Sequence, residues 1–164
     1  MQIIIKQKDL KAVAYAMADK DVRYYLNGVY VESNGAETRI VATDGARMNI
    51  VAISSADSDI VDPASIILPS EFVKALCKAK FPRGLSKEFT LAFDGMKASV
   101  TMPDGNDVTC KGIDGTFPNY RMVVPTEASG EYAFLDPDFR LDAAKAWGEY
   151  AERKHIMAPE FAYV

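Results

Sequence analysis

Residues 37–54, ETRIVATDGARMNIVAIS, hold two runs of alternating apolar and polar residues on either side of Asp44-Gly45. Successive side chains of a strand point to opposite faces, so each run predicts a strand with one buried face. An Asp-Gly pair between two such runs is a strong short-range signal for a β-hairpin, because glycine adopts the positive φ of a tight turn. Residues 88–103, EFTLAFDGMKASVTMP, repeat this arrangement around Asp94-Gly95. The chain therefore uses the same hairpin twice.

Three further segments carry apolar residues at helical spacing: KDLKAVAYAMADK (8–20), PSEFVKALCKAK (69–80) and DPDFRLDAAKAWGEYAERK (136–154). They recur roughly 60 to 67 positions apart, which indicates a helix-plus-strands unit used once, used again and begun a third time. Two such units can pair their sheets around two helices. The pattern predicts an α+β fold in which a duplicated helix-plus-strands unit packs two helices, near 8–19 and 70–80, against antiparallel sheets.

The third unit divides the chain into two predicted parts. We expect one domain over residues 1–125 and the beginning of a further, incomplete domain over residues 126–164, with PTEASGE (125–131) as the boundary. A lone helix cannot bury its own apolar stripe, so the third unit must pack against the first domain, pair with another chain or be unfinished. The sequence looks truncated at Val164.

The segment VRYYLNGVYVES (22–33) predicts another hairpin, with its turn at Asn27-Gly28 or shortly after. Arg23, Tyr24 and Tyr25 stand directly before that turn. A globular domain normally buries tyrosine with its hydroxyl on a partner, so two adjacent tyrosines beside an arginine are unusual. They mark this loop as a candidate binding surface.

Composition limits the function classes. The chain has 164 residues, 49% of them apolar, and a net charge of −4. The overall charge therefore does not indicate a nucleic-acid-binding protein, although a local basic stripe remains possible. Cys77 and Cys110 fit no metal-binding spacing and are expected to be reduced, buried thiols. The apolar run near the N-terminus is too short for a signal sequence or a membrane span. We expect a cytoplasmic protein without a membrane segment.

The sequence shows no pattern that is typical of a catalytic site. His155 is the only histidine, no serine stands in a nucleophile elbow, and the glycines punctuate turns instead of forming a phosphate loop. Asp57, Asp59 and Asp62 form an acidic loop, but it lacks the glycine and terminal glutamate of a calcium loop. We therefore predict no catalytic residue, no metal and no cofactor.

The basic residues are more informative. Lys8 and Lys11 lie off the apolar stripe of the first helix, and Lys74 and Lys78 lie off that of the second. Each face alone is an ordinary solvated helix surface. On two helices placed side by side, the faces merge into one positive surface that suits phosphates without reading base sequence.

Three motifs resemble one family. DVRYYLNGVYVE (21–32), RIVATDGARMNIV (39–51) and GIDGTFPNYRMVVP (112–125) are similar, in order and spacing, to the middle domain of the bacterial DNA polymerase III beta subunit, the DNA sliding clamp. The resemblance covers residues 1–125 well and continues more weakly into the opening of the family's last domain. It implies the DNA clamp fold, in which such domains close a ring with helices inside and sheets outside.

The resemblance also implies a function. A member of this family is a non-enzymatic processivity factor that encircles duplex DNA as a homo-oligomeric ring. It binds DNA independently of sequence and tethers DNA polymerase, clamp-loader and other client peptides. The alternative is a clamp-like interaction module that binds replication peptides without closing a ring.

The motifs carry the family's binding residues onto this chain. The DNA-binding set implied by the loop and helix faces is Lys8, Lys11, Lys20, Arg23, Tyr24, Tyr25, Lys74 and Lys78. The partner-peptide pocket implied at the domain edge is Leu26, Thr43, Gly45, Arg47, Met48, Pro118, Met122 and Val123. Two positions depart from the family pattern, with Ala46 in place of a common histidine and Met122 in place of a common arginine. The alternative is that these side chains only seal the core at a domain edge.

Overall fold

The computed structural model describes residues 2–34, 37–54, 63–124 and 136–151. In chain order the elements are β1 (Gln2–Lys6), α1 (Gln7–Ala14), η1 (Tyr24–Leu26), β2 (Gly28–Ser33), β3 (Glu37–Thr43), β4 (Met48–Ser54), β5 (Ala64–Pro69), α2 (Ser70–Lys78), β6 (Glu88–Asp94), β7 (Lys97–Thr101), β8 (Asp107–Lys111), η2 (Tyr120–Met122) and α3 (Pro137–Ala151). Both predicted Asp-Gly hairpins are present, as β3–β4 and β6–β7. The predicted α+β fold, with strands around both Asp-Gly turns, is confirmed.

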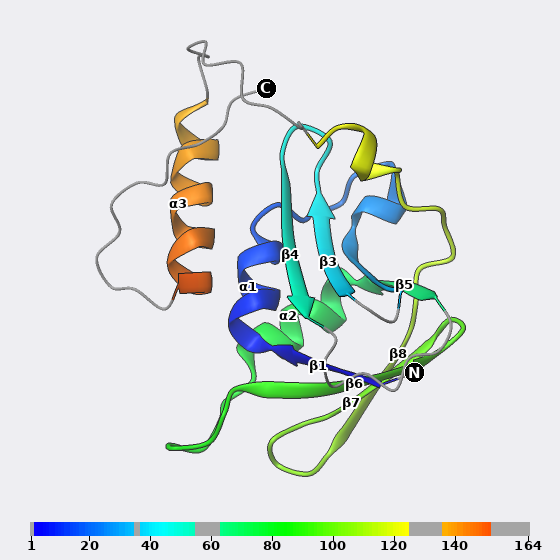
Figure 1. Cartoon of the computed structure of the whole chain (residues 1–164), viewed down its shortest axis with the longest axis vertical. Coiled ribbons are helices and arrows are strands. Elements are labelled where there is room, and N and C mark those ends of the chain that lie inside the picture. The colour runs from blue at the N-terminus through cyan, green and yellow to red at the C-terminus, as the bar shows by residue number, and fades with distance from the viewer. Residues whose placement is uncertain (1, 35–36, 55–62, 125–135, 152–164) are drawn as a thin grey trace.

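The duplicated unit begins with a strand, and the two copies exchange that strand. One sheet has the order β1-β6-β7-β8 and the other β4-β3-β2-β5 (Figure 1). Each sheet therefore combines three strands of one unit with the first strand of the other. β1 pairs antiparallel with β6, and β5 pairs antiparallel with β2. Because of this exchange, neither unit completes its sheet without the other.

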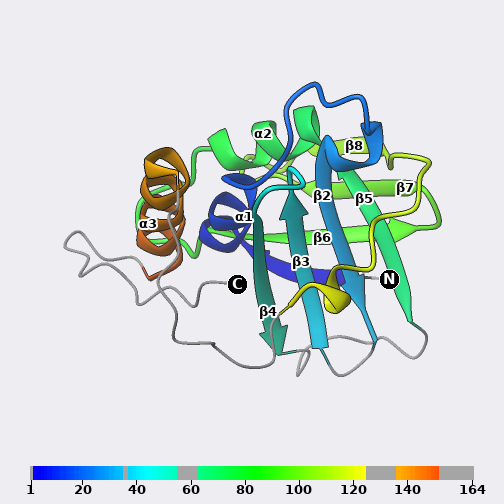
Figure 2. The same cartoon turned by 90° about the horizontal axis from the view of Figure 1, so that it is seen from above.

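Helices α1 and α2 lie side by side and share one core with both sheets (Figures 1 and 2). Helix α1 buries Leu10 and Val13, and α2 buries Phe72, Val73 and Leu76. These side chains meet the inward-facing residues of alternating strands, among them the fully buried Phe89 of β6. The predicted packing of the two helices is confirmed, although α1 ends at Ala14 and is shorter than the expected 8–19.

The predicted hairpin at Asn27-Gly28 is wrong, because no strand precedes it. Residues 24–26 form the 3₁₀ turn η1, and β2 begins at Gly28. Asn27 closes this loop with its side chain: Oδ1 accepts from the Asp21 N–H at 2.8 Å, and Nδ2 donates to the Asp21 carbonyl at 2.8 Å. A Cβ on Gly28 would collide with the Leu68 carbonyl of β5. Glycine is needed here for close strand approach, not for a turn.

A second, smaller core covers the other face of the β4-β3-β2-β5 sheet. The segment that follows β8 crosses this face, and its Phe117 stacks on Tyr30 with ring centroids 4.7 Å apart. The Ile113 N–H donates to the Ile67 carbonyl at 2.9 Å, which fixes the start of the crossing. At its far end the Tyr120 hydroxyl and the Arg121 guanidinium both donate to Glu32. The DG-FP-YR motif thus seals a sheet face.

Several sequence expectations fall outside the described residues. These are His155, the acidic loop at 57–62, the boundary at 125–131 and the strand expected after the third helix. Cys77 and Cys110 are free thiols, as predicted, but both are half-buried instead of fully buried. No helix in the described part of the chain is long and apolar enough to span a membrane.

Candidate functional site

The three motifs meet around Arg23, Tyr24 and Tyr25. Gly45 has a φ of +93°, and a Cβ there would lie 2.6 Å from Nη1 of Arg23. A Cβ on Gly115 would lie 3.0 Å from Cβ of Tyr25 and 3.2 Å from Cε2 of Tyr24. Each glycine therefore leaves the room that one side of the Arg-Tyr-Tyr loop occupies.

Arg23 joins the loop to the β3–β4 turn. Its Nε and Nη2 donate to the two carboxylate oxygens of Asp21 at 3.0 and 2.7 Å, and Nη2 also donates to the Asp44 carbonyl at 2.9 Å. The side-chain hydrogen bond from Arg23 lowers the pKa of Asp21 to about 2. The guanidinium is exposed, so it presents charge to solvent from a fixed position.

The two tyrosines have different environments. Tyr24 is 56% exposed, whereas Tyr25 is half-buried against the second core. Their rings meet edge to face with centroids 5.7 Å apart. Tyr25 therefore supports Tyr24, which offers an aromatic surface beside the Arg23 charge.

The β3–β4 turn is held by its own side chains. Asp44 Oδ1 accepts from the N–H groups of Ala46 and Arg47 at 2.9 and 3.0 Å. The Thr43 hydroxyl accepts from the Gly45 N–H at 3.0 Å and donates to the Arg47 carbonyl at 2.6 Å. Thr43 and Gly45, both predicted for the peptide pocket, thus build the turn that positions Arg47.

Arg47 connects the turn to α3. Its Nε donates to Asp44 at 3.0 Å, its Nη1 donates to Asp142 at 2.7 Å, and its guanidinium lies 4.8 Å from the Phe139 ring centroid. Partial burial lowers the pKa of Arg47, because it disfavours the charged guanidinium. The hydrogen bonds from Arg47 to Asp142 and Asp44 outweigh this effect, so the pKa of Arg47 is raised. The same hydrogen bond lowers the pKa of Asp142. The third helix is therefore anchored on a residue of the predicted pocket.

A cavity of about 230 Å³ lies between the turn and α3. Its lining residues are Tyr15, Ala46, Arg47, Met48, Asn49, Phe139, Arg140, Asp142 and Ala143. Small-molecule pockets usually measure about 300–1,000 Å³, so this one suits a single large side chain. Tyr15, Phe139 and Asp142 were missed from the sequence, although Phe139 and Asp142 stand three residues apart and so share a helix face.

The other predicted pocket residues lie elsewhere. Leu26 is only 2% exposed and belongs to the second core, where the half-buried Met48 also packs. Pro118, Met122 and Val123 are exposed near η2 and do not line the cavity. With Met122 at 82% and Val123 at 67% exposure, they form a separate apolar surface patch.

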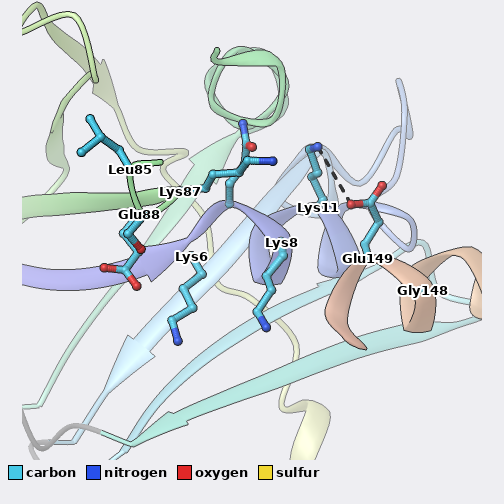
Figure 3. Close-up of a pocket in the computed structure, with 10 residues that line it drawn as sticks. Lys6, Lys8, Lys11, Leu85, Lys87, Glu88, Gly148 and Glu149 are labelled. Carbon is cyan, nitrogen blue, oxygen red and sulfur yellow. Dashed lines mark ion pairs between the residues drawn. The ribbon is translucent and has the colours of Figure 1, made fainter. Parts of the chain in front are cut away.

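The predicted DNA-binding lysines differ in whether they form ion pairs. Lys11 pairs with Glu149 at 3.9 Å and Lys74 pairs with Asp19 at 3.1 Å, whereas Lys20 and Lys78 are exposed. Figure 3 shows Lys11 turned toward Glu149 of α3 and Lys8 directed the opposite way, beside Lys6. Lys8 also lies 5.7 Å from the Tyr150 ring centroid. Among the described residues, no cluster of histidine, cysteine or acidic side chains is suited to hold a metal ion.

Comparisons with known proteins identify the family to which this fold belongs. The family described as "DNA polymerase III beta subunit, central domain" matches residues 5–119. The beta sliding clamp of Escherichia coli K12 is 34% identical over 135 residues, which is 82% of this chain and 33% of that protein. The beta sliding clamp of Vibrio cholerae is 34% identical over 137 residues, 79% of this chain and 35% of that protein.

Solved structures give the same answer. The DNA polymerase III subunit beta of Pseudomonas aeruginosa superposes with a TM-score of 0.65 at 30% identity, covering 79% of this chain and 35% of that one. The chain thus spans about a third of the length of the relatives it matches. The match over residues 5–119 includes both Asp-Gly hairpins, both core helices and most of the crossing segment. The chain belongs to the DNA polymerase III beta subunit family, the beta sliding clamps, and its residues 5–119 match the central domain of that family.

Proposed function

We propose that the chain acts as a DNA polymerase processivity factor: it contributes to a ring around duplex DNA and docks client peptides at the β3–β4 turn. The observation that carries this proposal is the cavity between Arg47–Met48 and α3. The resemblance implies a peptide pocket between the middle and last domains, and α3, the first element of the third unit, supplies a second wall to this cavity.

The cavity has the chemistry that an extended peptide with apolar anchors requires. Met48 and Phe139 give it apolar walls, and methionine adapts to anchors of different shape. Arg47 brings hydrogen-bond donors to its rim for a peptide carbonyl or an acidic side chain. Because Asp142 already holds Arg47, an acidic peptide group would share or replace that carboxylate.

The Arg-Tyr-Tyr loop supports contact with DNA. Arg23 holds its guanidinium in a fixed position, where a DNA phosphate would compete with the Asp21 carboxylate for it. The exposed Tyr24 ring beside it can pack on a sugar or base. Neither group selects a base sequence, as a ring that slides along duplex DNA requires. The proposed activity is thus binding alone, with no catalytic step.

Ring closure has its own test, because a clamp-like module without a ring would also bind peptides. We expect light scattering on the full-length protein to give the mass of a closed homo-oligomer at micromolar concentration. A strict monomer that still binds client peptide would favour the interaction-module alternative.

Peptide docking is tested by fluorescence anisotropy with a labelled glutamine-leucine-phenylalanine clamp peptide. Met48→Ala is expected to weaken binding by at least about 1 kcal/mol, the usual threshold for an interface residue that matters, because it removes an apolar wall of the cavity. Met96→Ala is the matched control, since Met96 is also half-buried and stands in the turn of the equivalent hairpin β6–β7. Equal affinities for the two variants would place the peptide elsewhere.

A further inference from the structure

Arg47 has an acidic partner on each side before any peptide binds. Its Nε donates to Asp44 at 3.0 Å, and its Nη1 donates to Asp142 at 2.7 Å. The first partner belongs to the same β3–β4 turn, whereas the second stands on α3, 95 positions further along the chain. The side chains of Arg47 and Asp142 are each 26% exposed. This ion pair therefore lies in the wall of the 230 Å³ cavity, partly shielded from water.

Asp142 is itself held in place from a second side. Its Oδ1 accepts from Nζ of Lys145 at 3.2 Å, one turn along the same helix. The hydrogen bonds from Arg47 and Lys145 lower the pKa of Asp142, so the carboxylate is charged at neutral pH. On the preceding turn of α3, the ring of Phe139 lies with its centroid 4.8 Å from the Arg47 guanidinium. Helix α3 thus presents a fixed negative charge to Arg47.

The rest of the cavity lining carries little charge that could outweigh this ion pair. Met48 and Phe139 are apolar, and Ala46 stands where the family pattern commonly has a histidine. Among the lining residues, Arg140 is the only charged side chain outside the pair, and it is exposed. Water and salt screen an exposed charge much more than a partly buried one. The ion pair is therefore the feature of the cavity that distinguishes a charged ligand from a neutral one.

A peptide carboxylate and a neutral peptide acceptor meet the pair differently. A carboxylate that approaches Arg47 also approaches the carboxylate of Asp142, and the two like charges repel. If it displaces Asp142, it leaves that carboxylate without its strongest partner. A backbone carbonyl or an amide side chain carries no net charge. It can accept from the guanidinium beside the two existing hydrogen bonds, because arginine has five N–H donors.

We propose that Asp142 is a specificity-determining residue of the peptide pocket: it occupies Arg47 and thereby selects peptides with an uncharged group at that position over peptides with a glutamate or aspartate there. Discrimination of this kind comes from a charge placed against the disfavoured ligand. The proposal rests on the proposed function, because it requires a peptide in the cavity. It adds the class of peptide that the cavity accepts.

The test uses the full-length protein and a set of labelled peptides with a glutamine-leucine-phenylalanine motif. Each position outside the leucine-phenylalanine pair holds glutamine in one peptide and glutamate in its counterpart. Fluorescence anisotropy gives the ratio of the two dissociation constants at every position. Asp142→Asn keeps the shape of the side chain and an oxygen that accepts from Arg47, so α3 stays anchored. At one position at least, we expect this variant to shift the ratio by about fivefold or more in favour of glutamate.

Asp138→Asn is the matched control. It makes the same change in net charge on the same helix, but Asp138 is exposed and does not line the cavity. Equal shifts in the two variants would reduce the effect to net charge and overturn the role of Asp142. Glutamine peptides that bind while Asp142→Asn shifts the ratio at no position would overturn this proposal and keep the proposed function. Absence of peptide binding by the parent would contradict the proposed function and this proposal with it.

A second substitution tests whether Asp142 acts through Arg47. In an Arg47→Gln background the guanidinium is absent, so Asp142→Asn is expected to shift the ratio by about twofold or less, as coupled residues require. A full shift in this background would show that Asp142 repels acidic peptides directly and would contradict the proposed occupation of Arg47. Far-UV circular dichroism checks that all variants keep their helices.

Discussion

Leu26→Ala is expected to lower the free energy of unfolding by about 2–5 kcal/mol, the range for truncating a buried leucine. Leu26 is almost fully buried and belongs to the second core together with Val41 and Ile67. The alanine leaves a cavity there, because strands pinned by their sheet cannot collapse into it. Urea denaturation measures the effect. Leu141→Ala, at an exposed leucine of α3, is the control and should stay within about 0.5 kcal/mol of the parent.

The same variant separates two roles for Leu26. The family resemblance places it in the wall of the peptide pocket, whereas the structure places it in the core. At a temperature where the variant remains folded, we expect peptide affinity close to that of the parent. A variant of normal stability that loses peptide binding would return Leu26 to the pocket wall.

Gln7→Leu is expected to lower the free energy of unfolding by about 2 kcal/mol, as an unsatisfied buried polar group does. Gln7 is 4% exposed, and its Nε2 lies 3.0, 3.2 and 2.9 Å from the carbonyl oxygens of Leu76, Cys77 and Ala79. Carbonyls at the end of a helix have no partner within the helix, and Gln7 supplies donors to the end of α2. Leucine keeps the bulk and removes these donors.

The matched control for this prediction is Gln2→Leu, at an exposed glutamine of β1. Thermal unfolding of both variants gives the comparison. If the two unfold at the same temperature, water serves the α2 carbonyls as well as Gln7 does. Gln7 also links the start of α1 to the end of α2 through these hydrogen bonds.

The sequence predicted those parts of the fold that depend on neighbouring residues. The β3–β4 and β6–β7 hairpins follow from an Asp-Gly pair between alternating runs, and α2 follows from its apolar stripe. The exchange of β1 and β5 was not predicted, because the partner of a strand lies far along the chain and leaves no local signal. The hairpin predicted at Asn27-Gly28 was wrong for a related reason. Gly28 is required because a Cβ there would collide with the carbonyl of Leu68 on another strand, not because it forms a turn.

The candidate site shows the same limit. Arg47 and Met48, which line the cavity, were predicted because they belong to a motif that is contiguous in sequence. Asp142, which holds Arg47, lies 95 positions further along the chain and belongs to no motif. Leu26 was placed in the pocket by resemblance, and no periodicity of the 3₁₀ turn could show that its side chain enters the core.

Topological retention on DNA tests the proposed clamp function most directly. The full-length protein is loaded on a nicked circular plasmid, separated from free protein by gel filtration, and then followed before and after a single restriction cut. We expect the protein to stay with the circle at a salt concentration that removes it from linear DNA, and to leave once the circle is cut, because a closed ring slides off a free end. Release at the same rate from circular and linear DNA would contradict encirclement.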